Sequence, residues 1–379
     1  MIVVVGAGLA GLHTVRALRE RGYAGALMLL GAEHEAPYDR PPLSKRVLSG
    51  ESDHSTLEAD WDTLDVDLRL GVRARTVAPG LLTTDAGDVP FESCVLATGA
   101  EPRRLPGPGV TLRTRAESLA LRAALVPGAR LVVVGAGWIG AEVATAATAA
   151  GARVTVVEAG ATPVPTALPA EVGERMRTWW SPVDLRLGLS VTAVEGGAVH
   201  LAGGAHVEAD VVLVAIGAQP STVEGVALDR RGAVAVDRRL RTSLPGVWAV
   251  GDCAAWESSR YATRMLVEHW DAALHAPSSV AANVLGGDEV WDPVPYFWSE
   301  QWGRMVQYAG HHPVADRTVW RDAGDTWAVF WLAGDRLVAA LAVDRPRDLV
   351  QARRLMQRDE TVEDALLADP SVPVKAAVR

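Results

Sequence analysis

The stretch IVVVGAGLAGLHTVRALRERG, residues 2–22, decides the fold of this 379-residue chain. An apolar, β-branched run leads into Gly6-x-Gly8-x-x-Gly11, and apolar residues then follow at three- and four-residue spacing as far as Gly22. This order predicts a strand, a tight turn and a helix. The next apolar run, ALMLLGAE at residues 26–33, predicts a second strand with an acidic residue at its end. Together these features form the dinucleotide-binding pattern.

The same pattern occurs again as LVVVGAGWIGAEVATAATAAG, residues 131–151, followed by RVTVVEAG at 153–160 with Glu158 at the strand end. The first glycine of each copy permits the tight turn, the second lets the backbone approach a pyrophosphate, and the third lets helix and strand pack closely. The helix N-terminus then faces the phosphates. The residues expected to contact dinucleotides are Gly6, Gly8, Leu9, Ala10, Gly11, Gly135, Gly137, Trp138, Ile139 and Gly140.

Three further strand ends favour two bound dinucleotides over a duplication with one inactive site. CVLATGAEPRRLPGPG (94–109) ends a strand at Thr98 and Gly99, and its Pro- and Gly-rich exit predicts a crossing between domains. DVVLVAIGAQPS (210–221) repeats this design with Gly217. TSLPGVWAVGDCA (242–254) places Gly251 and Asp252 after a strand, where a carboxylate suits a hydroxyl-bearing ligand, although an isolated Gly-Asp is usually an ordinary turn.

Composition narrows the function classes. The net charge is −9 and no long run of one sign occurs, which argues against nonspecific binding to nucleic acid or an anionic membrane. The two cysteines, Cys94 and Cys253, are far apart and form no CxxC, so we expect neither a metal site nor a disulfide framework, and a reducing cytoplasm fits best. The chain enters an apolar strand at once and contains no apolar run long enough to span a membrane, so we expect a soluble, unexported protein.

The segment APYDRPPLSK, residues 36–45, is a poor helix and a poor strand, because proline fixes φ and lacks a backbone donor. We interpret it as a stiff, charged loop. Pro41 and Pro42 would hold Lys45 in place with little conformational entropy left to lose.

The order GAGLAG, APYDRPPLSK, ATGAEP, GAGWIGAE, VAIGAQP, VWAVGD, VEHWDAA and YFWSEQWG resembles the NADH-dependent flavoprotein ferredoxin reductases of oxygenase systems, relatives of rubredoxin reductases and of the apoptosis-inducing factor. The resemblance covers essentially the whole chain. It implies an α/β fold with two doubly wound, glutathione-reductase-like dinucleotide-binding domains and a smaller α+β C-terminal domain. The implied FAD domain is discontinuous (1–106 and 230–291), the NAD domain spans 107–229, and the C-terminal domain that covers the flavin spans 292–379.

The resemblance also implies roles for individual residues. Lys45 would lie beside the flavin and pair with Glu142 of the second glycine motif, which would join the two domains. Asp252 would accept from a ribityl hydroxyl, and the helix that begins near Trp270 would direct its N-terminus at the flavin pyrimidine. The remaining implied cofactor contacts are Glu33, Arg40, Ala74, Arg113 and Trp298.

The implied reaction is hydride transfer from NADH to FAD, followed by single-electron transfer to an iron-sulfur ferredoxin that serves an oxygenase. Glu158 would favour NADH, because its carboxylate would repel a 2′-phosphate. Two alternatives stay open: an NADH-sensing interaction protein, and a disulfide, peroxide or oxygen reductase, which would need a redox cysteine that the neighbourhood of Lys45 lacks. We expect a monomer or homodimer.

The densest basic stretch, DRPRDLVQARRLMQR at 344–358, is the expected docking surface for an acidic ferredoxin. Its arginines are Arg345, Arg347, Arg353, Arg354 and Arg358. On a helix Arg347, Arg354 and Arg358 would share one side, with Leu349, Val350 and Leu355 largely available for packing. The alternative is a solvated helix face with internal pairs to Asp344 and Asp348.

Some features depart from the family pattern. Ala32 occupies the usual acidic position, with Glu33 one residue later, and Ala272 replaces an expected Asn. Pro277 should end or kink its helix early. We interpret Cys253 as a small buried hydrophobic residue and the doublet His311-His312 as solvated.

Overall fold

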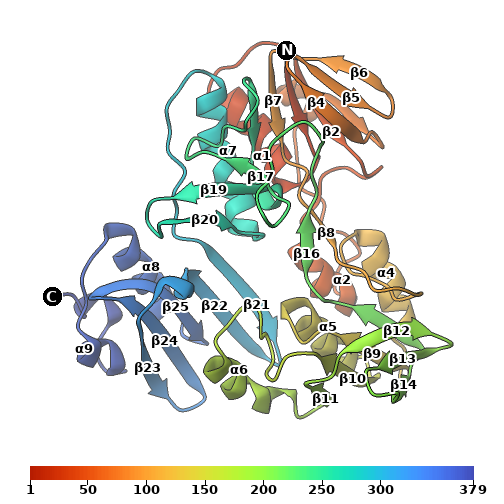
Figure 1. The fold of residues 1–379 in the computed structure, drawn as a ribbon, viewed down its shortest axis with the longest axis vertical. Coiled ribbons are helices and arrows are strands. Elements are labelled where there is room, and N and C mark those ends of the chain that lie inside the picture. The colour runs from red at the N-terminus through yellow and green to blue at the C-terminus, as the bar shows by residue number, and fades with distance from the viewer.

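The computed structural model describes residues 1–379, and its first body is built on the N-terminal glycine turn (Figure 1). All neighbouring strands of its five-stranded sheet are parallel, in the order β18-β7-β1-β2-β3. The strands are β1 (Ile2–Val5), β2 (Leu27–Gly31), β3 (Asp67–Leu70), β7 (Ser93–Leu96) and β18 (Val247–Ala249). Because β1 is central and fully buried, its apolar residues face the protein interior on both sides of the sheet.

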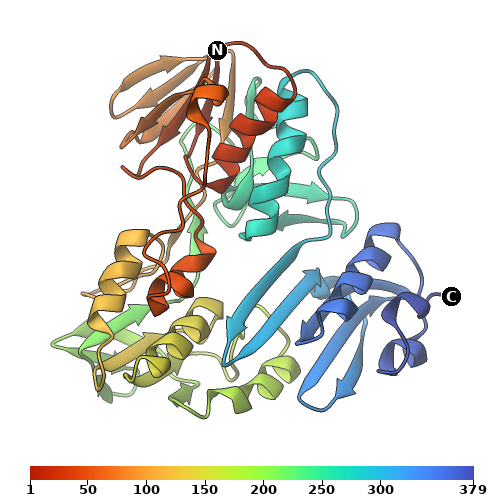
Figure 2. The same ribbon diagram turned by 180° about the vertical axis from the view of Figure 1, so that it is seen from behind.

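Helices α1 (Leu9–Glu20) and α7 (Trp270–Val284) run side by side against this sheet, although they are far apart in sequence (Figure 2). Pro277 was expected to end or kink α7 early; the helix does not end there, since it continues for seven residues past Pro277. Pro277 and its neighbours Ala276 and Val280 are buried. Packing against α1 therefore offsets the backbone hydrogen bond that proline cannot make.

Smaller sheets complete the first body. One antiparallel meander contains β4 (Ala74–Ala78), β5 (Leu81–Thr84) and β6 (Gly87–Pro90), and another sheet contains β17 (Val234–Val236), β19 (Ala254–Ser258) and β20 (Thr263–Leu266). The short helical segments are η1 (Pro41–Ser44), α2 (Arg46–Ser49), α3 (Trp61–Leu64) and η3 (Gly251–Cys253).

The second body repeats the design with a four-stranded parallel sheet in the order β11-β10-β9-β15. Its strands are β9 (Arg130–Val134), β10 (Arg153–Glu158), β11 (Asp184–Leu187) and β15 (Val211–Val214), and its meander contains β12 (Val191–Glu195), β13 (Ala198–Leu201) and β14 (His206–Glu208). Its helices are α4 (Arg115–Ala124), α5 (Trp138–Ala149), α6 (Ala170–Arg177) and η2 (Thr178–Trp180).

The chain passes between the two bodies twice, through β8 (Ala100–Pro102) and β16 (Ala218–Pro220), which pair antiparallel (Figure 1). Residues 41–49 form a third connection. They belong to the first body in sequence but pack on the second, where Ser118 Oγ of α4 donates to the Leu43 carbonyl at 2.6 Å. The segment expected to be a stiff loop is thus a proline-led 3₁₀ turn that places Lys45 beside α5.

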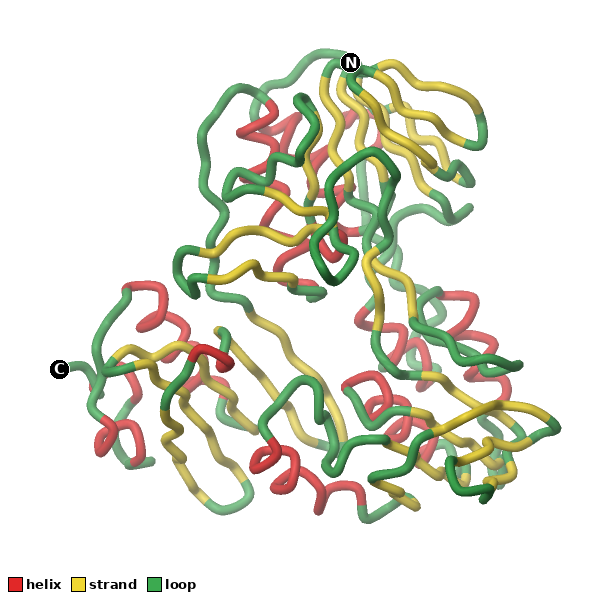
Figure 3. The backbone as a smooth tube through the Cα atoms, in the orientation of Figure 1, coloured by secondary structure: helices red, strands yellow, loops and turns green.

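The third body is a five-stranded antiparallel sheet in the order β21-β22-β25-β24-β23. Its strands are β21 (Tyr296–Gln301), β22 (Arg304–Gly310), β23 (Arg317–Ala323), β24 (Thr326–Ala333) and β25 (Arg336–Val343), and its helical segments are η4 (His312–Val314), α8 (Pro346–Arg358), α9 (Asp364–Ala368) and η5 (Val374–Ala376). The tube view shows β21 extending from this sheet toward the other two bodies (Figure 3).

The largest hydrophobic cluster contains residues from all three bodies, among them Leu12 of α1, Val172 of α6 and Val329 of β24. The predicted α/β fold, with two doubly wound domains and a smaller α+β C-terminal domain, is confirmed. The domain boundaries at 106/107, 229/230 and 291/292 stay a prediction.

Candidate active site

One cavity of about 860 Å³ is lined by both glycine turns and by β21. This volume lies in the range of small-molecule sites, which is roughly 300–1,000 Å³. The predicted site residues that line it are Gly6, Gly8, Leu9, Ala10, Glu33, Arg40, Lys45, Ala74, Thr98, Gly99, Arg113, Gly135, Gly137, Trp138, Ile139, Glu142, Glu158, Gly217, Asp252, Trp270 and Trp298. Gly11, Gly140 and Gly251 lie outside the lining.

The three glycines of the first turn have different surroundings. Gly6 has φ +114°, and a Cβ there would lie 2.1 Å from the Ala97 carbonyl oxygen. A Cβ on Gly11 would lie 1.8 Å from the Gly6 carbonyl oxygen, so Gly11 serves close packing rather than ligand contact. A Cβ on Gly8 would meet nothing within 4 Å. The missing side chain at Gly8 therefore leaves cavity space, which fits close approach of a pyrophosphate.

Three helices begin at this cavity without a side-chain cap. The N-cap residues are Gly8 for α1, Gly137 for α5 and His269 for α7, and none of them caps its helix with a side chain. Helix N-termini carry unpaired amide donors and a partial positive charge. The cavity therefore fits a ligand with anionic groups at several points, as a pyrophosphate-containing dinucleotide has.

Two ion pairs line the first-body side of the cavity. Arg40 Nη2 lies 2.6 Å from Glu33 Oε1, and the Tyr38 hydroxyl donates to Glu33 Oε2 at 2.5 Å. Burial raises the pKa of Glu33, but Arg40 and Tyr38 outweigh burial, so the pKa lies below its ordinary value. Arg113 Nη2 lies 3.0 Å from Asp252 Oδ2.

Two buried polar atoms near these ion pairs lack a protein partner, Arg113 Nε and Glu268 Oε1. Both residues line the cavity. Unpaired buried polar groups are costly, so these atoms are suited to a polar ligand. The residues present therefore fit FAD, which the Gly6 to Ala10 turn, Glu33, Arg113 and Asp252 would contact if the predicted roles hold.

A charge network lies where the three bodies meet. Lys45 Nζ is 2.9 Å from Glu142 Oε2, and the carboxylate is 4% exposed. Ser44 Oγ donates to Glu142 Oε2 at 2.5 Å, and Ser299 Oγ donates to Oε1 at 2.6 Å. Sequence reasoning indicated Lys45 and Glu142 but missed both serines. Their position next to Lys45 and Trp298 in two quoted motifs was the available signal.

Aromatic side chains form one wall of the cavity. Phe297 of β21 stacks on His269, with ring centroids 4.4 Å apart, and meets Trp138 edge to face at 4.9 Å. Trp270 meets Trp298 edge to face at 5.7 Å. Burial lowers the pKa of His269 to about 4, although Asp252 and Asp271 act in the opposite direction, so its ring is neutral near pH 7. Sequence reasoning missed His269 and Phe297, although both lie within the quoted motifs.

Glu158 lies at the second glycine turn with both carboxylate oxygens fixed. Oε2 accepts from the Ala136 amide at 2.8 Å, and Oε1 accepts from the Gly160 amide at 2.7 Å. The adjoining lining residues Val164, Pro165 and Thr166 carry no positive charge. The site thus presents a fixed negative group, and these three adjoining residues offer no cation to a 2′-phosphate.

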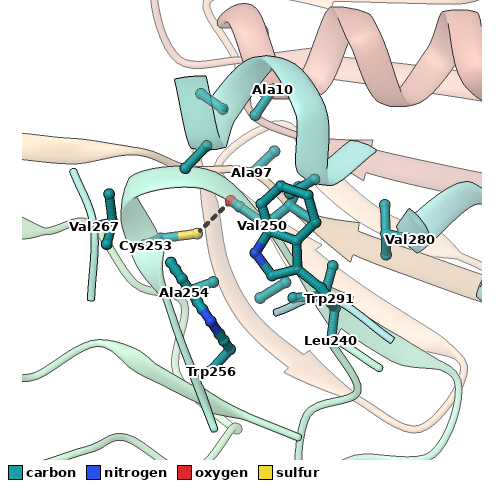
Figure 4. Packing of buried hydrophobic residues seen from close by; sticks show 14 of the residues in the cluster. Ala10, Ala97, Leu240, Val250, Cys253, Ala254, Trp256, Val267, Val280 and Trp291 are labelled. Atoms are coloured by element: carbon teal, nitrogen blue, oxygen red, sulfur yellow. Dashed lines mark hydrogen bonds between the residues drawn. The ribbon is translucent and has the colours of Figure 1, made fainter. Parts of the chain in front are cut away.

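Neither cysteine lines the cavity. Cys253 is fully buried among apolar residues, and its thiol contacts the Val250 carbonyl at 3.3 Å (Figure 4). Burial raises the pKa of Cys94 to about 12 and also raises that of Cys253. Both thiols are therefore poor nucleophiles, which confirms that Cys253 behaves as a small buried hydrophobic residue.

The arginines of the C-terminal segment do not form one uniform surface. Arg345 is 2.5 Å from Asp348, and Arg353 is 2.7 Å from Asp271, so both charges are compensated. Arg347, Arg354 and Arg358 are exposed and form no ion pair. The expectation that Val350 is available for packing is wrong, because it lies 48% exposed on this same face, whereas Leu349 and Leu355 are buried.

The expectation that the doublet His311-His312 is solvated is also wrong. The His311 ring is partly buried 5.5 Å from that of Tyr261, and burial lowers its pKa. His312 makes further contacts. Its Nδ1 is 3.0 Å from the Tyr308 hydroxyl, its ring lies 5.2 Å from that of Trp331, and burial lowers its pKa to about 4. The turn that carries it is packed on the sheet by these aromatic contacts.

No helix has both the length and the apolar character needed to cross a bilayer. The family described as pyridine nucleotide-disulphide oxidoreductase matches residues 1–276, and the family described as reductase C-terminal matches residues 296–378.

Known relatives match over nearly their full lengths. The ferredoxin–NAD(+) reductase component of the anthranilate 1,2-dioxygenase system of Burkholderia cepacia is 36% identical, with 98% of each chain covered. Rhodocoxin reductase of Rhodococcus erythropolis is 33% identical, with 100% of this chain and 94% of the relative covered. The crystal structure of Fdr9 superimposes with a TM-score of 0.95 at 47% identity over 98% of each chain. Putidaredoxin reductase in its covalent complex with putidaredoxin gives a TM-score of 0.93 at 30% identity over 99% of this chain and 98% of that one.

The chain belongs to the pyridine nucleotide-disulphide oxidoreductase family. Within it the chain groups with the FAD-dependent ferredoxin reductases, which confirms the resemblance drawn from the motifs. It is an NADH-dependent oxidoreductase that uses FAD.

Proposed function

We propose that this protein passes electrons from NADH, by way of FAD, to a small iron-sulfur ferredoxin that serves an oxygenase. The observation that supports this most strongly is a single cavity that both glycine turns line and that β21 closes with Phe297 and Trp298. When bound, FAD supplies the exchange between a hydride and two single electrons. The protein's own residues bind the dinucleotides, orient them and set the local charge.

We assign the first glycine turn to FAD and the second to NADH. The first turn adjoins Asp252 and Arg113, and the second adjoins Glu158. Lys45 and Glu142 connect the two halves, so their charges act where the dinucleotides would meet.

The assignment is tested with one substitution at each turn. Gly8→Val would fill cavity space beside the first turn and should reduce the FAD content of the purified protein. Gly137→Val, the matched change in the second turn, should leave FAD content normal and raise the KM for NADH. Loss of FAD from the Gly137→Val protein alone would reverse the assignment. A wild-type protein that carries FAD but fails to reduce any ferredoxin with NADH would overturn the proposed function.

The docking surface is proposed on α8 around Arg347, Arg354 and Arg358, with exposed Val350 among them. Arg345 was expected to contribute to this surface, but its ion pair with Asp348 reduces the positive charge that it can offer to a partner. Three uncompensated cations on a protein of net charge −9 provide a local attraction for an acidic partner.

The alternative of a disulfide reductase lacks its essential group, because no thiol faces the cavity. The NADH-sensing alternative predicts a long-lived reduced protein with bound NAD and slow turnover with ferredoxin, which stopped-flow spectroscopy would detect. The two buried, unpaired cysteines support a reducing cytoplasm as the proposed compartment.

A further inference from the structure

The Glu142 carboxylate receives donors from two chain segments outside its own body. Ser44 and Lys45 come from the proline-led turn of the first body, and Ser299 comes from β21 of the third body. Ser299 is fully buried and Glu142 is 4% exposed. Solvent therefore cannot replace the Ser299 hydroxyl, and loss of this donor leaves Oε1 of the buried carboxylate without a hydrogen bond, although Lys45 and Ser44 still contact Oε2.

The direction of the Ser299 hydrogen bond is fixed by its neighbours. An ionised carboxylate only accepts, so the hydroxyl proton of Ser299 points at Glu142 Oε1. Gln301 Nε2 lies 3.3 Å from Ser299 Oγ and donates to it. Gln301 is also buried. A relay of two donors therefore runs from Gln301 through Ser299 to Glu142.

Strand β21 links this relay to the cavity wall. Phe297 and Trp298 precede Ser299 on the strand and line the cavity. After Ser299 the Trp302 amide donates to Thr145 Oγ1 of α5 at 3.1 Å. Glu142 and Thr145 lie three residues apart on α5, so the strand and the residue directly after it are anchored to one face of the helix at two points.

We infer that Ser299 is a positioning residue for the reaction: it holds the Glu142 carboxylate in place beside Lys45 and tunes the reduction potential at the cavity. The inference rests on the proposed function. The positive end of the hydroxyl dipole offsets part of the carboxylate charge. Without it the cavity is more negative, which disfavours adding electrons to a ligand there.

The test measures the midpoint potential of the bound flavin in the complete protein. Ser299→Ala should lower the equilibrium constant for two-electron reduction by about tenfold, which corresponds to a fall of about 30 mV. Glu142→Gln removes the charge on which Ser299 acts. Ser299→Ala added to Glu142→Gln should therefore give no further change in potential.

Thr145→Val is the matched control, because it removes the other β21 anchor on α5 without touching Glu142. Both Ser299→Ala and Thr145→Val should increase hydrogen exchange in β21, whereas only Ser299→Ala should shift the potential. An unchanged potential in Ser299→Ala, or an equal shift in Thr145→Val, would overturn the inference. Either result leaves the proposed function intact if the wild-type protein still reduces ferredoxin with NADH.

Discussion

The guanidinium of Arg353 lies over the ring of Tyr296, 5.1 Å from its centroid, and so connects helix α8 to strand β21. Tyr296 in turn stacks with Trp298, with the ring centroids 6.1 Å apart, and Trp298 lines the cavity. A chain of side-chain contacts through Arg353, Tyr296 and Trp298 therefore connects α8 to the cavity wall.

The first prediction concerns docking on α8. Arg354→Glu combined with Arg358→Glu should raise the KM for ferredoxin about tenfold at low salt and flatten its dependence on ionic strength, because long-range attraction is lost. NADH-driven reduction of a small artificial acceptor should stay normal. The control is Arg153→Glu combined with Arg230→Glu, which makes the same charge change at two other exposed arginines. Unaffected ferredoxin turnover in the α8 variant would place the docking surface elsewhere.

Lys45 is predicted to support hydride transfer through its pairing with Glu142. In Lys45→Ala the buried carboxylate loses its cation, and a more negative cavity opposes the arrival of electrons. The stopped-flow rate of flavin reduction by NADH should fall by about a hundredfold. Arg46→Ala is the matched control, since Arg46 is adjacent, exposed and in no ion pair. Equal rates for Lys45→Ala and wild type would leave the segment 36–45 with a purely structural role.

Glu158 is predicted to select NADH over NADPH. Its fixed carboxylate should disfavour a 2′-phosphate by about tenfold or more in kcat/KM, as expected for like charges in contact. Glu158→Ala should reduce the difference in kcat/KM between the two cofactors, mainly by raising kcat/KM for NADPH. Glu158→Gln should narrow this difference as well, although its single carbonyl oxygen can accept from only one of the Ala136 and Gly160 amides. Comparable kcat/KM values for the two cofactors in the wild-type protein would contradict this assignment.

His269 is predicted to make stability sensitive to acid. Its folded pKa is about 4, mainly because of burial, and lies below the ordinary value of 6.5. The unfolded chain therefore binds the proton more readily, so stability rises with pH from about 4 to about 6.5 and is level above that range. His269→Gln should show a smaller drop in the thermal-unfolding midpoint between pH 6.5 and pH 4.5 than wild type at the same FAD concentration. His54→Gln, at an exposed position, should follow wild type.

The sequence alone determined the two dinucleotide-binding units, because their chemistry depends on local backbone geometry. Glycine is required at position 6 for a positive φ and at position 11 for close packing, and both requirements fall within one short stretch of sequence. The order of motifs also indicated the family and the pairing of Lys45 with Glu142. These features are local or fixed by shared ancestry, so they are readable without coordinates.

The tertiary structure decided which distant residues meet. Ser299 reaches Glu142 only because β21 extends from the third body onto α5. The pattern of apolar and polar residues in the sequence does not predict that contact. The sequence also does not show that the charge of Arg353 is compensated by Asp271 of α7, whereas its neighbour Arg354 forms no ion pair. At Pro277 a local rule predicted that the helix would end or kink, but α7 packs on α1 and continues past this residue. Local backbone preferences are set by a few neighbouring residues, whereas burial and charge pairing depend on the positions of side chains far along the chain, which only the folded structure fixes.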